Sequence, residues 1–463
     1  MQFSIRSVLT NGIAAVLLVI PIVTSSHPLT GDAREYLLMA HRLMQGRSPD
    51  VSVEHAQIAG VYEPRLINAR GQQEMWHFWF FPLCAVPVMV ITTWMNASPV
   101  VAFGAFNAIL LWIAFIIVRR RSGTWSAIFV CLSPIIWWTD KAQVEVFTFF
   151  WLVMGFMAVH RLPWAALCFA VAATQQPPIG ALVLVTGAAA ILRQEMHLSD
   201  VWLWALVVVV VVLHPLYYWV HLGRLTPLVE ASDVRIPGVR AFITPLIDLN
   251  VGLLVNAPVI AFAFSAAIVA SALVVSERKP TVLVLAAYLI FLFAFAQAPN
   301  VNSGGTPGMT RYALWFIPPC VALLDHASSR LRRRGFAAVT FGSAAWSVLF
   351  FRPSLPEQYL WPTPVAAAVW SRYPAFENPL PEIFAERLRH KDGVNTLAST
   401  PNCGKALVQG GQWPDPCAPV GPVPPACSSD GALCYANRRS DGRYDFVLTS
   451  RRGGVRLAEI FWR

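Results

Sequence analysis

The sequence predicts an all-α membrane protein that crosses the bilayer many times, with a long first external loop and a small extracytoplasmic C-terminal region. Of the 463 residues, 56% are hydrophobic and 13% are charged, whereas in soluble domains roughly a quarter of all residues are charged. Many apolar stretches reach the roughly 17 to 25 residues that a helix needs to cross hydrocarbon. Helices satisfy their own backbone hydrogen bonds in lipid, and the stretches do not alternate as barrel strands would.

The apolar segments predict about eleven transmembrane helices. In chain order they run near Thr10–Thr24, His77–Met95, Val100–Val118, Trp125–Trp138, Val144–Val159, Pro163–Leu192, Val201–Val220, Val251–Val274, Thr281–Ala298, Arg311–Leu324 and Phe336–Phe351. The basic start MQFSIR favours a cytoplasmic N-terminus, although the small residues at 24–26 also fit a cleaved signal peptide. The RLRRR run at Arg330–Arg334 should be cytoplasmic, so the next helix places the C-terminus outside.

Two topologies are open between residues 77 and 192. Simple alternation places Arg119–Arg121 outside, against the tendency of basic residues to remain in the cytoplasm. The alternative makes His77–Met95 re-entrant and divides Pro163–Leu192 into two short spans at Gln175–Pro178. That arrangement places the three arginines inside and is slightly favoured for this reason.

The chain is predicted to divide into a transmembrane domain at residues 1–351 and an extracytoplasmic region at residues 352–463. Four cysteines share a Pro/Gly-rich polar stretch of that region: Cys403, Cys417, Cys427 and Cys434. Two disulfides are favoured over a zinc site, because no CxxC spacing or paired histidine accompanies them, and three pairings are open. The other four lie in apolar segments and are interpreted as packing residues: Cys84, Cys131, Cys168 and Cys320.

The first external loop, residues 25–75, is far longer than a normal connection between helices. From Ala33 its pattern becomes helical, with Gly46 as the stop. The apolar face of this helix consists of Tyr36, Met39, Ala40, Leu43 and Met44. We therefore expect a short amphipathic helix at the membrane surface.

Several motifs, taken in their order, resemble the C superfamily of membrane glycosyltransferases, which includes protein mannosyltransferases and lipid A aminoarabinose transferases. The stretch DAREYLLMAHRLMQG at residues 32–46 matches their pattern after the first span. Further matches are Ser133-Pro134 with Thr139-Asp140 and Glu145, Thr174–Pro177 with glutamine in place of lysine, and Asn300–Gly305 followed by Arg311-Tyr312. The resemblance implies transfer of a hexose or pentose from a polyprenyl phosphate, with inversion, to an extracytoplasmic lipid, glycan or protein acceptor.

Such a transfer needs a base and positive charge. A carboxylate must accept the proton of the attacking hydroxyl, and Asp32 occupies the matching position. The leaving phosphate calls for arginines, because their planar fork binds two oxygens; Arg311 is the first choice, before Arg65, Arg70 and Arg235. Further candidates for the acceptor site or cavity are Glu74, His77, Asp140, Glu145, Gln175 and Tyr312. No cofactor is certain, and the use of a divalent metal stays open.

The expected partners are the bilayer, the polyprenyl-phosphate sugar and the acceptor. The net charge of +10 is attributed to headgroups or phosphates rather than to nucleic acid, because many arginines flank apolar segments. The expected location is the bacterial inner membrane, as a multi-pass protein.

Structural interpretations compete with these roles. Asp32 is also a good helix N-cap, with Glu35 completing a capping box. Arg311 could anchor a helix end at headgroups, and Asp140 could pair with Lys141. His27, His41, His55 and His77 have irregular spacing, which favours interfacial positions over a metal site with Glu74. Trp76, Trp79 and Trp315 are belt or packing residues, or face a sugar ring.

Two other functions are open. A transporter or lipid flippase also needs many helices, but no internal repeat relates the two halves of the chain. A non-catalytic scaffold would explain the cysteine-containing tail, but not the acidic and arginine-rich first loop.

Overall fold

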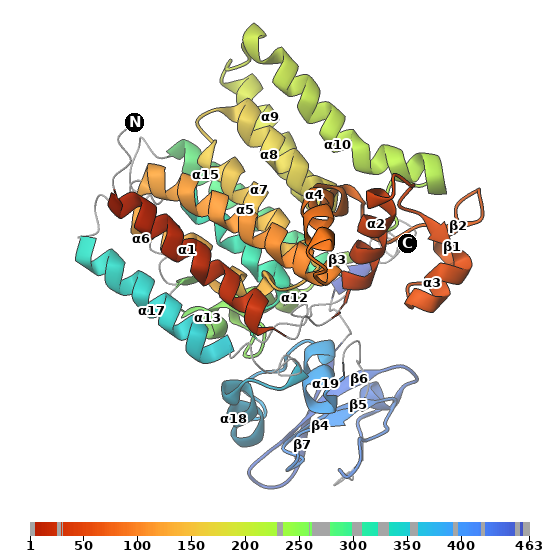
Figure 1. Ribbon diagram of the computed structural model, residues 1–463. Helices are drawn as coiled ribbons and strands as arrows, with labels where there is room; N and C mark the ends of the chain where they lie inside the picture. Colours follow the sequence, from red (N-terminus) through yellow and green to blue (C-terminus); the bar gives the residue numbers. More distant parts are fainter. Residues whose placement is uncertain are drawn as a thin grey trace. The chain divides into compact units, whose positions relative to one another are not determined.

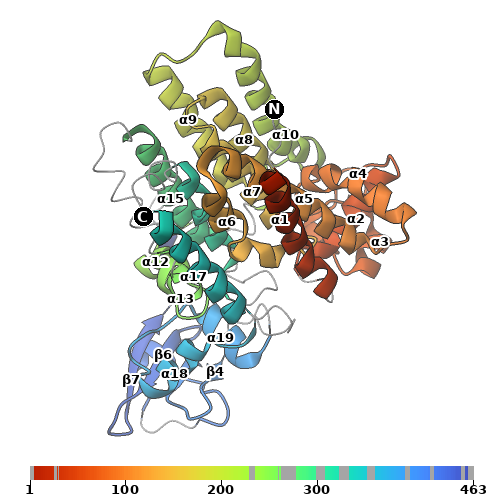
Figure 2. The ribbon, with the colours of Figure 1, turned by 60° about the vertical axis from the view of Figure 1, so that its left-hand side comes forward.

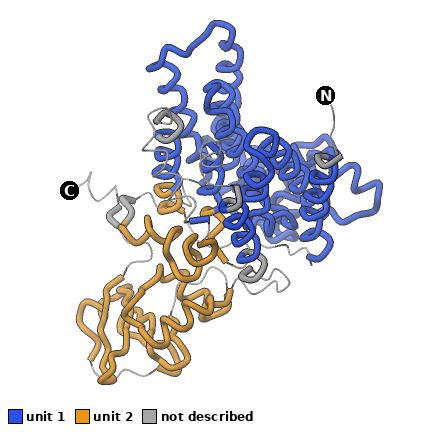
Figure 3. Tube along the Cα trace, turned by 90° about the vertical axis from the view of Figure 1, so that its left-hand side faces the viewer, with its two compact units in different colours: residues 1–231, 259–291, 314–349 blue, residues 232–258, 292–313, 350–463 orange. Residues whose placement is uncertain are grey.

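The computed structural model describes residues 5–25, 29, 31–228, 235–258, 260–261, 278–298, 308–322, 333–351, 360–391, 397–417, 422–449 and 454–456. The chain divides into two units (Figure 3). The first contains residues 1–231, 259–291 and 314–349, and the second contains residues 232–258, 292–313 and 350–463. The second unit therefore takes two segments that precede the boundary predicted at residue 351, and that boundary stays a prediction.

Helices form the body of the first unit (Figure 1). They are α1 (Ile5–Thr24), α4 (Phe80–Trp94), α5 (Pro99–Ser122), α6 (Thr124–Cys131), α7 (Glu145–Met157), α8 (Leu162–Gln175), α9 (Gly180–Leu192), α10 (Val201–Leu222), α15 (Arg278–Gln297) and α17 (Arg333–Phe351). Short 3₁₀ turns accompany them: η2 (Pro134–Trp138), η3 (Pro177–Ile179), η4 (Leu198–Asp200), η6 (Arg311–Phe316) and η7 (Pro318–Cys320). Helices α15 and α17 end within the second unit, and η6 begins there.

Two helices are central to this packing. Helix α8 lies against α7, α9 and α10, and α5 lies against α1, α4, α6 and α7 (Figures 1 and 2). The close approach of α7 and α8 depends on Gly155, because a Cβ atom there would lie 2.3 Å from the ring of Phe169. Phe156 of α7 packs on Phe169 of α8, with ring centroids 5.0 Å apart. These two residues therefore lie at the same height along the helix pair. The short link between α7 and α8 makes them antiparallel neighbours.

Two helices among the described residues are long and apolar enough to cross a membrane. They are Pro99–Ser122 and Leu198–Leu222, with mean hydropathies of 2.5 and 2.1. Shorter apolar helices are Val8–Thr24, Phe80–Trp94, Glu145–Met157, Leu162–Gln175, Pro177–Leu192 and Val282–Gln297. Only 28% of the apolar window of Leu198–Leu222 is buried, so most of its Val and Leu side chains face outward. Such an exterior suits lipid better than water, while the number of eleven crossings stays a prediction.

Two segments that were predicted to cross the membrane as continuous helices are interrupted in the structure, so these two predictions are wrong. Trp125–Trp138 contains the eight-residue helix α6 and then η2. A helix of that length spans roughly 12 Å, less than half the hydrocarbon thickness. The break comes at Ser133, which is extended because Pro134 disfavours a helical conformation in the preceding residue. Arg311–Leu324 begins with η6 and η7, where Pro318 and Pro319 interrupt the helical hydrogen bonds.

The predicted division of Pro163–Leu192 is confirmed. Helix α8 ends at Gln175, and α9 begins at Gly180 after Pro177 and Pro178. The division belongs to the alternative topology, whose orientation stays a prediction. Some predictions fall outside the described residues: residues 262–277 of the span at Val251–Val274, His27, Asn300–Gly305 and residues 330–332 of the RLRRR run.

The amphipathic helix predicted in the first loop is confirmed as α2 (Ala33–Met44). It ends before Gly46, whose φ of +68° is the left-handed conformation that favours glycine. Tyr36, Met39 and Ala40 are buried, and α2 packs against α4. The rest of the loop contains β1 (Val51–Ser52), α3 (Val53–Ala59), η1 (Pro64–Leu66) and β2 (Gln72–Gln73), with β1 antiparallel to β2.

The second unit corrects the all-α prediction. Strands β4 (Ala398–Ser399), β5 (Lys405–Gln409), β6 (Leu433–Arg438) and β7 (Tyr444–Thr449) form an antiparallel sheet in that order. Strand β3 (Arg235–Pro237) pairs with β8 (Gly454–Arg456). The helices are α12 (Val239–Ile247), α13 (Leu253–Asn256), α18 (Pro364–Arg372), α19 (Pro381–Arg389) and α20 (Pro425–Ser428). The sequence conceals β5 and β6 because nearly all their residues are buried, so polar and apolar positions do not alternate.

Both faces of the four-stranded sheet are covered by aromatic side chains. On one face Trp370 and Phe384 pack with ring centroids 4.8 Å apart, and Phe384 lies 5.4 Å from Tyr435. The other face buries Ala406, Val408 and Ala436 beneath Trp413, Tyr444 and Phe446. This two-sided cover explains why apolar residues occupy consecutive positions of the central strands, such as Ala406–Val408 of β5.

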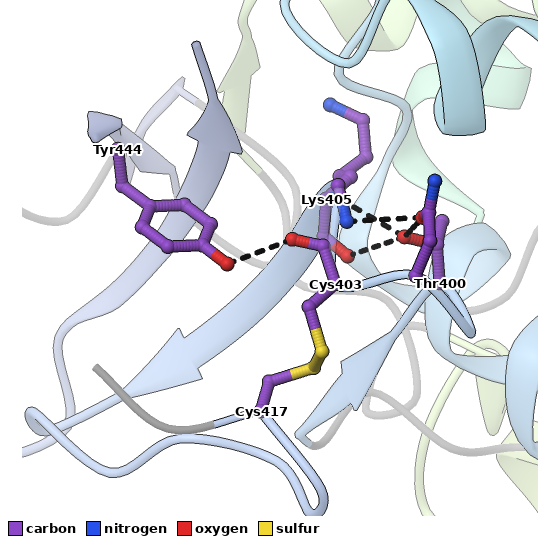
Figure 4. Close-up of a disulfide and its surroundings, with 7 residues drawn as sticks. Thr400, Cys403, Lys405, Cys417 and Tyr444 are labelled. Carbon is purple, nitrogen blue, oxygen red and sulfur yellow. Dashed lines mark hydrogen bonds between the residues drawn. A yellow bond between two sulfur atoms is a disulfide. The ribbon is translucent and has the colours of Figure 1, made fainter. Parts of the chain in front are cut away.

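The prediction of two disulfides in the tail is confirmed, and the structure selects one pairing. Cys403 bonds to Cys417 (Figure 4), and Cys427 bonds to Cys434. Each pair has a Cα–Cα distance of 5.7 Å. The Tyr444 hydroxyl donates to the Cys403 carbonyl at 2.8 Å. The four remaining cysteines are free thiols in apolar segments, as predicted. The zinc interpretation of the tail is wrong, because its four sulfurs are joined in pairs.

Lys405 lies close to the first disulfide and is fully buried (Figure 4). Its Nζ donates to Asn437 Oδ1 at 2.5 Å and to Asn378 Oδ1. Burial lowers the pKa of Lys405 to about 7, although the Glu377 carboxylate acts in the opposite direction. Burial, reinforced by the negative charge of Asp248, raises the pKa of Glu377 to about 8. A compact, hydrogen-bonded polar cluster therefore supports the tail.

The orientation of the tail can be tested with fusions. Alkaline phosphatase, which folds only outside the cytoplasm, should be active when fused after Thr400. The basic run at Arg330–Arg334 is expected to stay in the cytoplasm, so the helix that follows it leads the chain to the other side of the membrane. A second fusion after Arg121 should be inactive in the alternative topology and active in simple alternation. A cytoplasmic reporter that works after Thr400 would contradict the orientation.

Candidate active site in the first external loop

The segment Glu74–Phe80 links the first external loop to α4. On one side it contacts the start of α2, through His77. On the other it contacts the last turns of α10, through Glu74 and Met75. All of these contacts lie within the first unit. The segment therefore brings together polar residues that are far apart in the sequence.

Asp32 lies beside an imidazole that a second carboxylate holds. His77 Nε2 is 3.4 Å from Asp32 Oδ2, and His77 Nδ1 is 3.0 Å from Glu35 Oε2. Glu35 Oε2 also accepts the backbone N–H of His77 at 3.4 Å. Each ring nitrogen of His77 thus faces a carboxylate oxygen. The arrangement orients a carboxylate directly before the first turn of α2.

The capping interpretation of Asp32 is wrong. Asp32 has φ −77° and ψ −1°, which is helical rather than the extended conformation of most N-caps. In the described part of the chain its side chain makes no capping hydrogen bond. The carboxylate of Glu35, which would complete a capping box, bonds to His77 instead.

Glu74 forms a second acid–imidazole pair, which is buried. Its Oε1 accepts from Asn68 Nδ2 at 2.7 Å and lies 2.6 Å from His221 Nδ1. Its Oε2 accepts from the Tyr217 hydroxyl at 2.7 Å. Asn68 Nδ2 also lies 3.2 Å from Asp50 Oδ2, so the amide bridges two carboxylates. These bonds tie the loop to α10 and engage both oxygens of Glu74, which gives it a positioning role.

The sequence interpretation missed Tyr217 and His221 as site residues. They stand four positions apart on α10, so they share one helical face, and their rings lie 4.2 Å apart. Two polar aromatic residues near the end of a valine-rich helix were the available signal.

The predicted phosphate ligands have different surroundings. The Arg65 side chain is 59% exposed, and its Nε and Nη2 donate to the two oxygens of Glu63 at 2.9 and 3.0 Å. Its fork is thus engaged by a carboxylate, which weakens the case for phosphate binding. Arg70 is exposed on the turn before β2, and Arg235 lies in β3, opposite Arg456. Arg311 of the second unit donates from Nη2 to the Tyr312 hydroxyl at 3.3 Å.

The remaining candidates are buried in the first unit. Asp140 and Lys141 form an ion pair of 2.7 Å, as the structural interpretation predicted, and Ser25 Oγ also donates to Asp140. Glu145 begins α7, and Gln175 ends α8. Asp140 therefore has a structural explanation, whereas the roles of Glu145 and Gln175 stay predictions.

The histidines give no support to a metal site. No group of three or more His, Cys, Asp or Glu side chains in the described part of the chain is placed to hold a metal ion. Both ring nitrogens of His77 face carboxylates, His41 bonds to Gln45, and His55 bonds to Ser52. Metal dependence therefore finds no ligand set among these residues.

No protein family and no curated protein matches the chain by sequence. Its structure is similar to crystal structures of ArnT from Cupriavidus metallidurans, one bound to undecaprenyl phosphate and one in the apo state. The TM-scores are 0.48 and 0.45, and the sequence identities are 13% and 14%. Each match covers 72% of this chain and 62% of the ArnT chain, so the similarity extends over less than two thirds of ArnT.

Proposed function

We propose that the protein transfers a sugar from a polyprenyl-phosphate donor to an acceptor outside the cytoplasm, with inversion at the anomeric carbon. The order of motifs along the sequence suggests the reaction. The observation that carries the proposal is the placement of Asp32, whose carboxylate does not cap α2 and lies 3.4 Å from an imidazole held by Glu35. A carboxylate oriented in this way suits a general base.

In the proposed reaction, an acceptor hydroxyl attacks the anomeric carbon while its proton passes to Asp32. The bond between that carbon and the phosphate oxygen breaks, and its electrons leave with the phosphate. Attack opposite the leaving group inverts the configuration. The phosphate is already a good leaving group, so it needs stabilising positive charge more than a proton donor. His77 is a positioning residue, because it contacts Oδ2 of Asp32 and is itself held by Glu35.

The reaction can be tested with purified protein in liposomes. A labelled polyprenyl-phosphate sugar and an extract of membrane acceptor lipids should yield a labelled product with inverted anomeric configuration. Movement of the donor across the bilayer without a product would favour the flippase interpretation. Absence of both would favour the scaffold.

We further propose that Arg311 contributes to donor phosphate recognition, and Arg311→Lys tests this role. Lysine keeps the charge but loses the planar fork, so the KM for the donor should rise about tenfold, corresponding to roughly 1.4 kcal/mol. The measurement is transfer as a function of donor concentration. The control is Arg372→Lys, an exposed arginine of α18 in the same unit. An unchanged KM for Arg311→Lys would remove this residue from the phosphate site.

A further inference from the structure

Neutral polar side chains are buried near the ends of α7 and α8 without hydrogen-bond partners among the residues that the structure describes. The Gln175 side chain is 3% exposed, and neither its Nε2 nor its Oε1 has a partner. The same holds for Thr148 Oγ1 and for the indole nitrogens of Trp79 and Trp151. A polar group that is buried without a partner destabilises the fold, so each such group in a native structure calls for an explanation.

Ring contacts connect the two tryptophans. Trp79 lies 6.2 Å from Phe80, Phe80 lies 6.4 Å from Phe147, and Phe147 lies 6.2 Å from Trp151, all between ring centroids. Thr148 follows Phe147 on α7. The tryptophans are only partly buried, so this aromatic row reaches the surface of the first unit.

Gln175 lies at the same level as Thr148. The contact between Phe156 and Phe169 sets the register of the antiparallel helices. Thr148 lies roughly two turns from Phe156, and Gln175 lies roughly two turns from Phe169, toward the same end of the pair.

A second chain of contacts connects Gln175 to the segment that holds Asp32. The carbonyl of the preceding residue, Thr174, lies 2.8 Å from His214 Nδ1. His214 packs on Phe78 at 5.0 Å, and Phe78 packs on Trp79 at 4.8 Å. Phe78 directly follows His77, the residue that contacts Asp32. The end of α8 that carries Gln175 is thus connected, through His214 and Phe78, to the segment that contains His77.

We propose, resting on the function proposed above, that Gln175, Thr148, Trp79 and Trp151 form the subsite that binds the hydroxyl groups of the donor sugar. A carboxamide donates and accepts, a hydroxyl does both, and each indole donates, which matches the hydroxyls of a sugar ring. The neighbouring aromatic rings offer apolar faces to its C–H groups. None of the four side chains is charged, so they suit neither a phosphate nor a carboxylate.

The test compares lipid binding by Gln175→Leu with binding by Gln176→Leu, a matched change at the half-buried neighbouring glutamine. The probes are bare undecaprenyl phosphate and undecaprenyl phosphate carrying mannose, glucose, N-acetylgalactosamine or 4-amino-4-deoxyarabinose. Dissociation constants are measured in detergent by thermophoresis, and Tm is measured without lipid. The wild-type protein should bind at least one sugar lipid more tightly than the bare lipid.

Gln175→Leu should reduce that preference about tenfold, leave binding of the bare lipid unchanged, and leave Tm equal or higher, because it removes an unpartnered buried amide. Gln176→Leu should keep the preference. A retained preference in Gln175→Leu, an equal loss for bare and sugar lipids, or a lower Tm with unchanged preference would overturn the subsite. A wild-type protein without any preference would also overturn it; the proposed function then stands if liposome transfer occurs and fails if it does not.

Discussion

Replacing Asp32 by asparagine is expected to lower sugar transfer by about two orders of magnitude or more, because the proposed base is lost. Asparagine keeps the size of the side chain and caps helices about as well as aspartate. The fold should persist, since the Asp32 side chain makes no capping hydrogen bond within the described part of the chain. Binding of the donor lipid should persist as well.

The measurement is transfer of label from a polyprenyl-phosphate sugar, together with Tm and donor binding for each variant. Glu54→Gln is the matched control, because it removes an exposed carboxylate from the same loop. Wild-type transfer by Asp32→Asn would remove this residue from the mechanism. Equal losses in both variants would assign the effect to the charge of the loop rather than to a base.

Loss of a tail disulfide should destabilise the second unit strongly. From the lengths of the closed loops, replacing Cys403 and Cys417 together by serine should cost roughly 3 kcal/mol, and replacing Cys427 and Cys434 roughly 2.5 kcal/mol. The first pair closes the longer loop, with a sequence separation of 14 against 7. The first unit should remain folded, because its cysteines are free thiols.

Pulse proteolysis in increasing urea would report the stability of the tail, and non-reducing peptide mass spectrometry would report the pairing. Cys84→Ser, a change at a free thiol in the first unit, is the control. Four free thiols in protein taken directly from an oxidising compartment would contradict the pairing. A tail as resistant as wild type after loss of both bridges would contradict their stabilising role.

Apolar length predicted most helices of the first unit, because lipid or a buried core demands long runs of apolar side chains. It failed where proline interrupts such a run, as at Pro134 and at Pro318, since hydrophobicity alone does not report the missing backbone donor. The strands of the tail were not predicted, for a different reason. Residues of β5 are buried on both sides, and a short apolar run without alternation indicates no particular element.

Individual residues of the candidate site were predicted from the sequence, but the contacts between them were not. Asp32 and His77 were each proposed, whereas the imidazole link to Glu35 joins residues 42 positions apart. Glu74 meets Tyr217 across 143 positions. Neither periodicity nor motif spacing encodes such distances, because they follow from how α2 and α10 pack around the segment at residues 74–80. The unpartnered state of Gln175 likewise depends on tertiary neighbours.

The second unit is assembled from three separate stretches of chain, and this has a consequence for biosynthesis. Thr363 Oγ1 donates to the Leu249 carbonyl at 2.6 Å, and Leu380 and Ile383 pack with Val251 and Phe295 in one apolar cluster. The earlier stretches are translated well before residues 350–463, so Val251 and Phe295 stay without these partners until Leu380 and Ile383 have left the ribosome. A nascent chain that stopped at residue 351 would leave these apolar side chains uncovered, as a target for chaperones and proteases. Chaperones and proteases could thus recognise an unfinished chain by the exposed apolar side chains of Val251 and Phe295.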